Sequence, residues 1–114
     1  MSACVFCRIR DGELPSRKVY EDERVLAFHD INPQAPVHIL VVPKKHIPSL
    51  AEVTEEDLEL LGYLQLVIRR VAEQEGLAAE GYRVVVNTGR RAQQSVPHLH
   101  YHILGGRDMG WPPG

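Results

Sequence analysis

Three histidines alternate with apolar side chains near the carboxyl end of the chain, in the segment 98–104, which reads HLHYHIL. Successive side chains of a β-strand point to opposite faces of the sheet. The segment therefore predicts a strand with His98, His100 and His102 on one face and a core-forming opposite face. Each imidazole needs a hydrogen-bond partner or water, so three of them in register favour a functional cluster over ordinary packing.

The other apolar segments place this strand in an α+β domain with a mostly antiparallel, five-stranded sheet. Further strands are expected at 19–20, 25–29, 37–42 and 82–86. A short N-terminal helix is expected over residues 4–10. One long helix is expected over 54–75, where leucines and valines recur every three or four positions behind the N-cap Thr54. The strands do not alternate with helices, which argues against a parallel βαβ sheet.

The long helix is apolar over more of its surface than one sheet face can cover. This excess predicts a homodimer, although an entirely intramolecular core would account for the same residues. A length of 114 residues suits one domain. The net charge of −2 is too weak to attract nucleic acid or an anionic membrane, so neither partner is expected. The amino terminus lacks a signal-peptide pattern, so a cytoplasmic location is expected.

Two chemistries can use the histidine face. Zinc accepts two histidines at i and i+2 of one strand. A neutral imidazole can instead attack phosphorus and form a phosphohistidine, because imidazole titrates near neutral pH. The loop ahead of the strand favours phosphorus, since Asn87, Gln94 and Ser95 bring donors suited to phosphate oxygens. His38 stands alone in an apolar strand and is expected to join the cluster.

The histidine segment and its flanks resemble the motif of the histidine triad (HIT) superfamily, with Gln94-Ser95 before it and Gly105-Gly106-Arg107 after it. Further matching motifs are FHDINPQAP at 28–36, VH at 37–38, PKKH at 43–46 and WPPG at 111–114. Together they resemble the Hint branch, the histidine triad nucleotide-binding proteins, over essentially the whole chain.

The resemblance implies a HIT-like fold and a single HIT domain over residues 1–114. It implies a homodimer in which the C-terminal tail 107–114, with Trp111, reaches toward the partner subunit. It also implies a hydrolase of purine nucleoside phosphoramidates, which cleaves the P–N bond to release an amine and a nucleotide of AMP or GMP type. No cofactor is required for this catalysis.

Catalytic roles follow from the same resemblance. His100 would be the nucleophile that becomes nucleotidylated. His102 and Ser95 would contact the phosphate and the leaving group, and His38 and Asn87 would support the histidine cluster.

Nucleotide-binding residues are implied as well. Asp30 would accept hydrogen bonds from the ribose hydroxyls, and Gln94 would lie at the phosphate. The base would be walled by Phe6, Ile9, Leu14, Phe28, His29 and Ile31. Core packing is the alternative explanation for these residues, and it competes most closely for Ile9 and Leu14. An apolar slot discriminates poorly between adenine and guanine.

The two cysteines, Cys4 and Cys7, have a spacing typical of metal or redox use in a reducing compartment. Many microbial members of the family that carry this pair hold a structural zinc, so the resemblance implies a Cys₂His₂ site completed by His46 and His98. The alternative is a pair of thiols without a metal.

One position departs from the branch, because Gln93 stands where glycine is usual. A left-handed backbone there would be costly for a side chain. Arg90 and Arg91 lie in the same loop and would either draw in anionic substrates or serve as solvated surface charge.

Two alternatives to the phosphoramidase stay open, a zinc-dependent hydrolase and a nucleotide-binding regulatory module with little catalysis.

Overall fold

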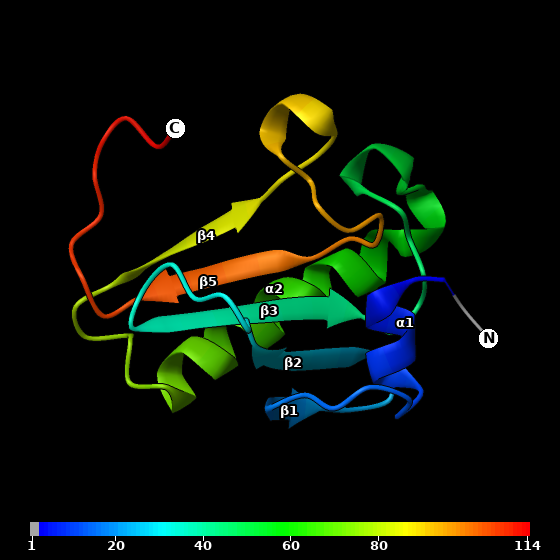
Figure 1. Cartoon of the computed structure of the whole chain (residues 1–114), viewed down its shortest axis with the longest axis horizontal. Coiled ribbons are helices and arrows are strands. Elements are labelled where there is room, and N and C mark those ends of the chain that lie inside the picture. Colours follow the sequence, from blue (N-terminus) through cyan, green and yellow to red (C-terminus); the bar gives the residue numbers. More distant parts are fainter. Residues whose placement is uncertain (1–2) are drawn as a thin grey trace.

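The computed structural model describes residues 3–114, and a single antiparallel sheet organises them (Figure 1). Its strands are β1 (Lys18–Glu21), β2 (Val25–His29), β3 (Val37–Pro43), β4 (Tyr82–Val86) and β5 (Tyr101–Gly105). They lie in the order β1-β2-β3-β5-β4, and every neighbouring pair is antiparallel. The predicted α+β class and the five-stranded antiparallel sheet are confirmed.

Two helices accompany the sheet, α1 (Val5–Arg10) and α2 (Leu58–Gln74). Short 3-10 turns lie at η1 (Leu50–Glu52), η2 (Glu55–Asp57) and η3 (Arg90–Ala92). Thr54 does cap the long helical segment, through a capping box with Asp57, but the first turn is η2 and the α-helix begins only at Leu58. Among residues 3–114, no helix is long and apolar enough to cross a membrane.

The central strand β3 is buried on both faces. Ile39 and Val41 belong to the apolar cluster that α2 completes with Leu64 and Val67. Leu40, on the opposite face, belongs to a second cluster that includes residues of α1. Figure 1 shows α2 behind the sheet and α1 at one end of the front face. The front face beyond α1 is therefore left for the histidines.

The histidine segment differs from the prediction, because β5 begins only at Tyr101 and the predicted strand 98–104 loses its first three residues. The ladder with β3 pairs Val41 with Tyr101, and β3 then ends at Pro43, which has no N–H to donate. The N–H of Leu99 instead donates to the carbonyl oxygen of Ile47, at 2.6 Å. The alternation survives this break, because Leu99 packs on the α2 side while the rings of His98 and His100 contact Phe6 of α1.

Asp22, in the turn between β1 and β2, ties that hairpin to α2. Its carboxylate accepts hydrogen bonds from the hydroxyls of Tyr20 and Tyr63 and from the backbone N–H groups of Arg24 and Val25. Burial alone would raise the pKa of Asp22, but these donors outweigh it and lower the pKa to about 2.

We expect Asp22→Asn to lower the free energy of unfolding at pH 7 by about 1–2 kcal/mol, allowing for solvent screening. The folded pKa lies below the unfolded one, so the contribution of the carboxylate is fully present above about pH 4. It fades as the pH falls toward 2. Urea unfolding of both proteins between pH 2 and 7 measures this, with Glu23→Gln in the same turn as the control. A difference that persists undiminished at pH 2 would contradict the assignment.

Candidate functional site

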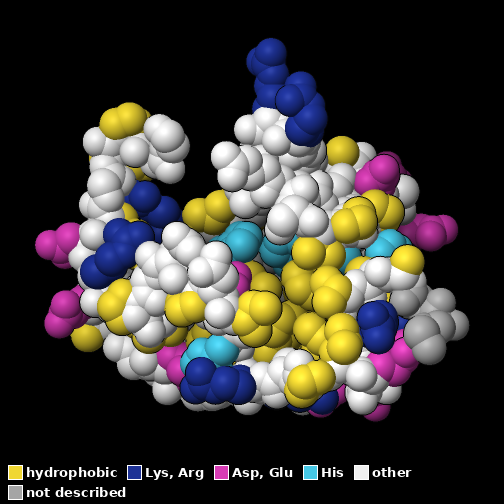
Figure 2. Space-filling view, in the orientation of Figure 1, with side chains coloured by type: hydrophobic (Ala, Val, Ile, Leu, Met, Phe, Trp, Pro, Cys, Tyr) yellow, Lys and Arg dark blue, Asp and Glu magenta, His cyan; other side chains and the backbone are white. Residues whose placement is uncertain are grey.

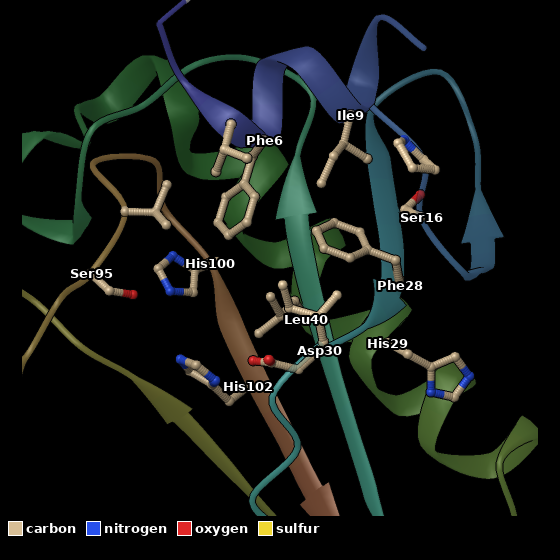
Figure 3. Close-up of a pocket in the computed structure, with 14 residues that line it drawn as sticks. Phe6, Ile9, Ser16, Phe28, His29, Asp30, Leu40, Ser95, His100 and His102 are labelled. Atoms are coloured by element: carbon tan, nitrogen blue, oxygen red, sulfur yellow. The ribbon is translucent and has the colours of Figure 1, made fainter. Parts of the chain in front are cut away.

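A pocket of about 300 Å³ opens on the front face, between α1, the end of β2 and the histidine segment. Figure 2 shows it as a hollow with an apolar floor and histidines along one side. It is lined by Val5, Phe6, Ile9, Pro15, Ser16, Phe28, His29, Asp30, Ile31, Leu40, Ser95, Val96, His100 and His102. In Figure 3, Phe6, Ile9, Phe28 and Leu40 gather on one side of this space, with His100, His102 and Ser95 on the other.

His100 presents one unprotonated ring nitrogen to the pocket. Its Nδ1 lies 2.7 Å from the backbone oxygen of His98, and a carbonyl can only accept, so Nδ1 carries the proton. In the neutral ring the lone pair is then on Nε2. The ring is buried, with Phe6 at a centroid distance of 5.1 Å in an edge contact. The structure thus fixes both the tautomer and the orientation of this imidazole.

His102 is fixed in the opposite tautomer by a chain of hydrogen bonds. The N–H of Gln34 donates to His38 Nδ1 at 3.0 Å, so the proton of His38 is on Nε2. That Nε2 lies 2.9 Å from His102 Nδ1, which must accept. The proton of His102 is therefore on Nε2, a buried atom with no hydrogen-bond partner among residues 3–114. A donor without a partner, on a residue that lines the pocket, suits an anionic ligand.

The rings of His38 and His102 are both neutral at pH 7. Burial lowers the pKa of His102 to about 4, with a further lowering from His100 and His38. Burial also lowers the pKa of His38, against the opposing effect of Asp30, whose Oδ2 lies 3.5 Å from His38 Nε2. The tautomers assigned to these two histidines require neutral rings.

Asp30, His38 and His102 lie close enough to hold a metal ion, since their ligand atoms are within 4.8 Å of one another. The chemistry of the set argues against that use. The N–H of Gln34 occupies the lone pair of His38 Nδ1, so the nitrogen that faces the set carries a proton.

The Cys/His set, formed by Cys4, Cys7, His46 and His98, fits a metal well. Cys4 Sγ lies 3.3 Å from His98 Nδ1, Cys7 Sγ lies 3.3 Å from His46 Nδ1, and the two Nδ1 atoms are 3.1 Å apart. Ligands of a tetrahedral zinc with ordinary bond lengths are about 3.3–3.8 Å apart. His98 Nε2 donates to the carbonyl oxygen of Pro43 at 2.8 Å, which leaves Nδ1 unprotonated toward the sulfurs. The donor set and its second shell therefore match those of a structural zinc site.

Most of the predicted site residues come together, and three do not. The predicted residues that line the pocket are Phe6, Ile9, Phe28, His29, Asp30, Ile31, Ser95, His100 and His102. His38 lies behind His102 and supports it. Leu14 packs against the cluster on the α1 side and does not line the pocket. Asn87 also lies outside the lining, directly after β4, and has no side-chain hydrogen bond with the described residues.

Gln94 is the third predicted site residue outside the pocket, because its side chain holds the loop that it belongs to instead of facing the pocket. Its Nε2 donates to the carbonyl oxygens of Pro48 and Val96, at 2.7 and 3.0 Å, and its Oε1 accepts from the N–H of Gly89. Gln93 has φ 63°, so its backbone lies in the left-handed region. This confirms the conformation that the usual glycine suggested, although the residue here carries a side chain.

Sequence reasoning missed five lining residues, Val5, Pro15, Ser16, Leu40 and Val96. Leu40 could have been found, because it lies two positions from His38 and so on the same face of β3. Ser16 carries a buried hydroxyl that has no partner in the described part of the chain, and no local sequence pattern points to it.

Comparison with known proteins agrees with this geometry. Residues 11–109 match the model of the HIT domain family. A 14 kDa zinc-binding protein of Zea mays is 56% identical over 115 residues, which cover 99% of this chain and 89% of that protein. An uncharacterized HIT-like protein of Synechococcus elongatus is 54% identical, with 96% of each chain covered. The crystal structure of a HIT family hydrolase from Legionella pneumophila superposes with a TM-score of 0.95 at 49% identity, covering 97% of this chain and 99% of that one. The chain belongs to the HIT domain family.

Proposed function

We propose that this protein is a hydrolase of the Hint branch that cleaves purine nucleoside phosphoramidates by double displacement at phosphorus. The observation that carries the proposal is the pair of fixed, opposite tautomers. His100 offers a lone pair on Nε2 while the neighbouring His102 offers a proton on Nε2. One is the form of a nucleophile and the other that of a hydrogen-bond donor to a phosphoryl oxygen. The Legionella relative is a hydrolase by name.

In the first step, His100 Nε2 attacks the α-phosphorus and the P–N bond to the amine breaks. The electron pair of that bond goes to the amine nitrogen, which takes a proton from the solvent through the Ser95 hydroxyl. His102 Nε2–H stabilises the charge on the phosphoryl oxygens. Figure 3 shows Ser95, His100 and His102 around one space, as this step requires.

In the second step, water attacks phosphorus and the bond between phosphorus and His100 Nε2 breaks. The electron pair returns to the ring, and the proton of the water leaves to the solvent. The products are the nucleoside monophosphate and the free amine, and the enzyme returns to its starting tautomer.

The nucleoside would lie in the apolar part of the pocket. Phe6 and Phe28 meet edge to face with centroids 5.6 Å apart, and a flat base of AMP or GMP type suits the slot they wall with Ile9. Asp30 is part-buried at the pocket edge and would accept hydrogen bonds from the ribose hydroxyls.

A zinc-dependent hydrolase is less well supported. The Cys/His set includes His98 and leaves His100 and His102 outside it. In the other set, formed by Asp30, His38 and His102, the His38 nitrogen that faces the set carries a proton. The nucleotide-binding regulatory module is distinguished by the measurement below.

We expect His100→Ala to reduce hydrolysis of an adenosine 5′-phosphoramidate by at least about 10³-fold, because it removes the nucleophile. Mass spectrometry of wild-type protein quenched during turnover should show a nucleotidyl adduct on His100. Circular dichroism of the variant checks that the fold survives. Wild-type rates in the variant would refute the mechanism, and firm AMP binding without turnover in the wild type would favour the regulatory module.

We also propose that Cys4, Cys7, His46 and His98 hold a structural zinc, which suits a reducing compartment such as the cytoplasm. Burial lowers the pKa of His98 to about 4, so the ring is neutral, as a ligand must be. A bound zinc would fix α1 to the segment that leads into β5. No catalytic step passes through it.

Elemental analysis should find about one zinc per chain in the wild type and much less in Cys7→Ser. The melting temperature should fall in the variant and on chelation, because the metal binds only the folded site. His29→Asn, which changes a histidine outside the set, should keep its zinc. Metal-free wild-type protein with an unchanged melting temperature on adding zinc would contradict the site.

We further propose that the chain, one HIT domain over residues 1–114, forms a homodimer through β4 and the neighbouring part of α2. β4 is an edge strand, and Val84, 40% exposed, faces the α2 side with its neighbour Ile103. Leu66 of α2 is 48% exposed. A second copy paired at this edge would cover both and would bring the tail 107–114, with its exposed Trp111, toward the partner site.

Light scattering on a sizing column should give twice the chain mass of 12.9 kDa for the wild type. Val84→Lys should shift the protein toward a single chain, because it places a charge in the covered face. Leu50→Lys, at an exposed leucine of η1, should leave the mass as it is. A wild-type protein of single-chain mass at micromolar concentration would refute the dimer.

A further inference from the structure

Two adjacent arginines without partners lie in the loop that leads into Ser95. Arg90 and Arg91 are exposed in η3, and neither has an ion pair, a side-chain hydrogen bond or a ring contact with any part of residues 3–114. Arg17 and Arg70 share that state, whereas each remaining lysine and arginine has at least one such interaction. Unpaired guanidinium groups keep their full attraction for an anion.

The loop that carries them is held in place. The N–H of Gln94 donates to the carbonyl oxygen of Gly89 at 3.1 Å, the N–H of Gln93 donates to that of Arg90 at 3.0 Å, and the Gln94 side chain anchors the loop to Pro48. Figure 2 shows basic side chains at the tip of a projection directly above the histidine-lined hollow. The two charges therefore have a fixed base, which lowers the entropy cost of binding.

The position of the loop relates it to the leaving group. Ser95 lines the pocket and directly follows the loop, on the side away from the apolar slot and from Asp30. In the proposed first step the amine takes its proton through the Ser95 hydroxyl, so the leaving group would lie on the Ser95 side of the pocket. Among the described lining residues the only carboxylate is Asp30, so no like charge repels an anion on the Ser95 side.

We propose that Arg90 and Arg91 form an anion-binding rim that selects phosphoramidates whose amine leaving group carries a carboxylate or a phosphate. The inference rests on the proposed phosphoramidase activity and specifies its substrate class. A guanidinium binds both anions through paired N–H donors, and charges at the rim of a site act mainly on association.

Three adenosine 5′-phosphoramidates test this, made with β-alanine, with its neutral amide and with 2-aminoethyl phosphate. For the double variant Arg90→Gln/Arg91→Gln, we expect the ratio of kcat/KM for each anionic substrate to that for the amide to fall roughly 5-fold at low salt. The loss should shrink as salt is added. A fall with only one of the anionic substrates identifies which anion the rim binds.

Arg70→Gln is the matched control, since it removes an equally unpaired charge from α2, on the other face of the sheet. It should leave the ratio as in the wild type. Equal ratios in the double variant and the wild type would overturn the rim. Absence of turnover for all three substrates in the wild type would instead overturn the phosphoramidase itself and the rim with it.

Discussion

The hydrogen bond from His100 Nδ1 to the backbone oxygen of His98 is the contact on which the site depends. It is possible because the segment leaves the β-ladder before Tyr101. β5 lies between β3 and β4, so a carbonyl in regular pairing would be directed at one neighbour or the other. Pro43 ends the pairing on one side, and the His98 carbonyl becomes available to a side chain two residues on. A break in secondary structure thus frees the carbonyl oxygen that fixes the tautomer of His100.

His98 joins this site to the Cys/His set. Its carbonyl fixes His100, its Nε2 donates to Pro43 and its Nδ1 faces Cys4 and Cys7. Any group held by the two sulfurs would restrain the same residue whose backbone carbonyl fixes the tautomer of His100. The structure places His98 in the Cys/His set and the rings of His100 and His102 at the pocket, although all three lie on a single run of alternating residues.

The sequence predicted features that depend on local periodicity. Strands 25–29 and 82–86 have the predicted bounds, because alternation and flanking turns define them locally. It could not predict that Gln94 would hold its own loop or that Ser16 would line the pocket, since both depend on contacts between distant segments. The sequence could not predict the tautomer of His102 either, because the backbone N–H of Gln34 sets it through His38.

Charge is distributed unusually for a site that would bind phosphate. Of the described residues that line the pocket, none is a lysine or arginine, and the rings of His38 and His102 are neutral. Phosphate would therefore meet oriented but uncharged donors, which favour the charge that develops in the transition state more than they tighten ground-state binding. Arg90 and Arg91 carry full positive charges outside the pocket, in the loop that precedes Ser95. Under the proposed function, this arrangement would separate two tasks: the uncharged donors would act on the phosphoryl group, and the charged loop would act on the group attached to it.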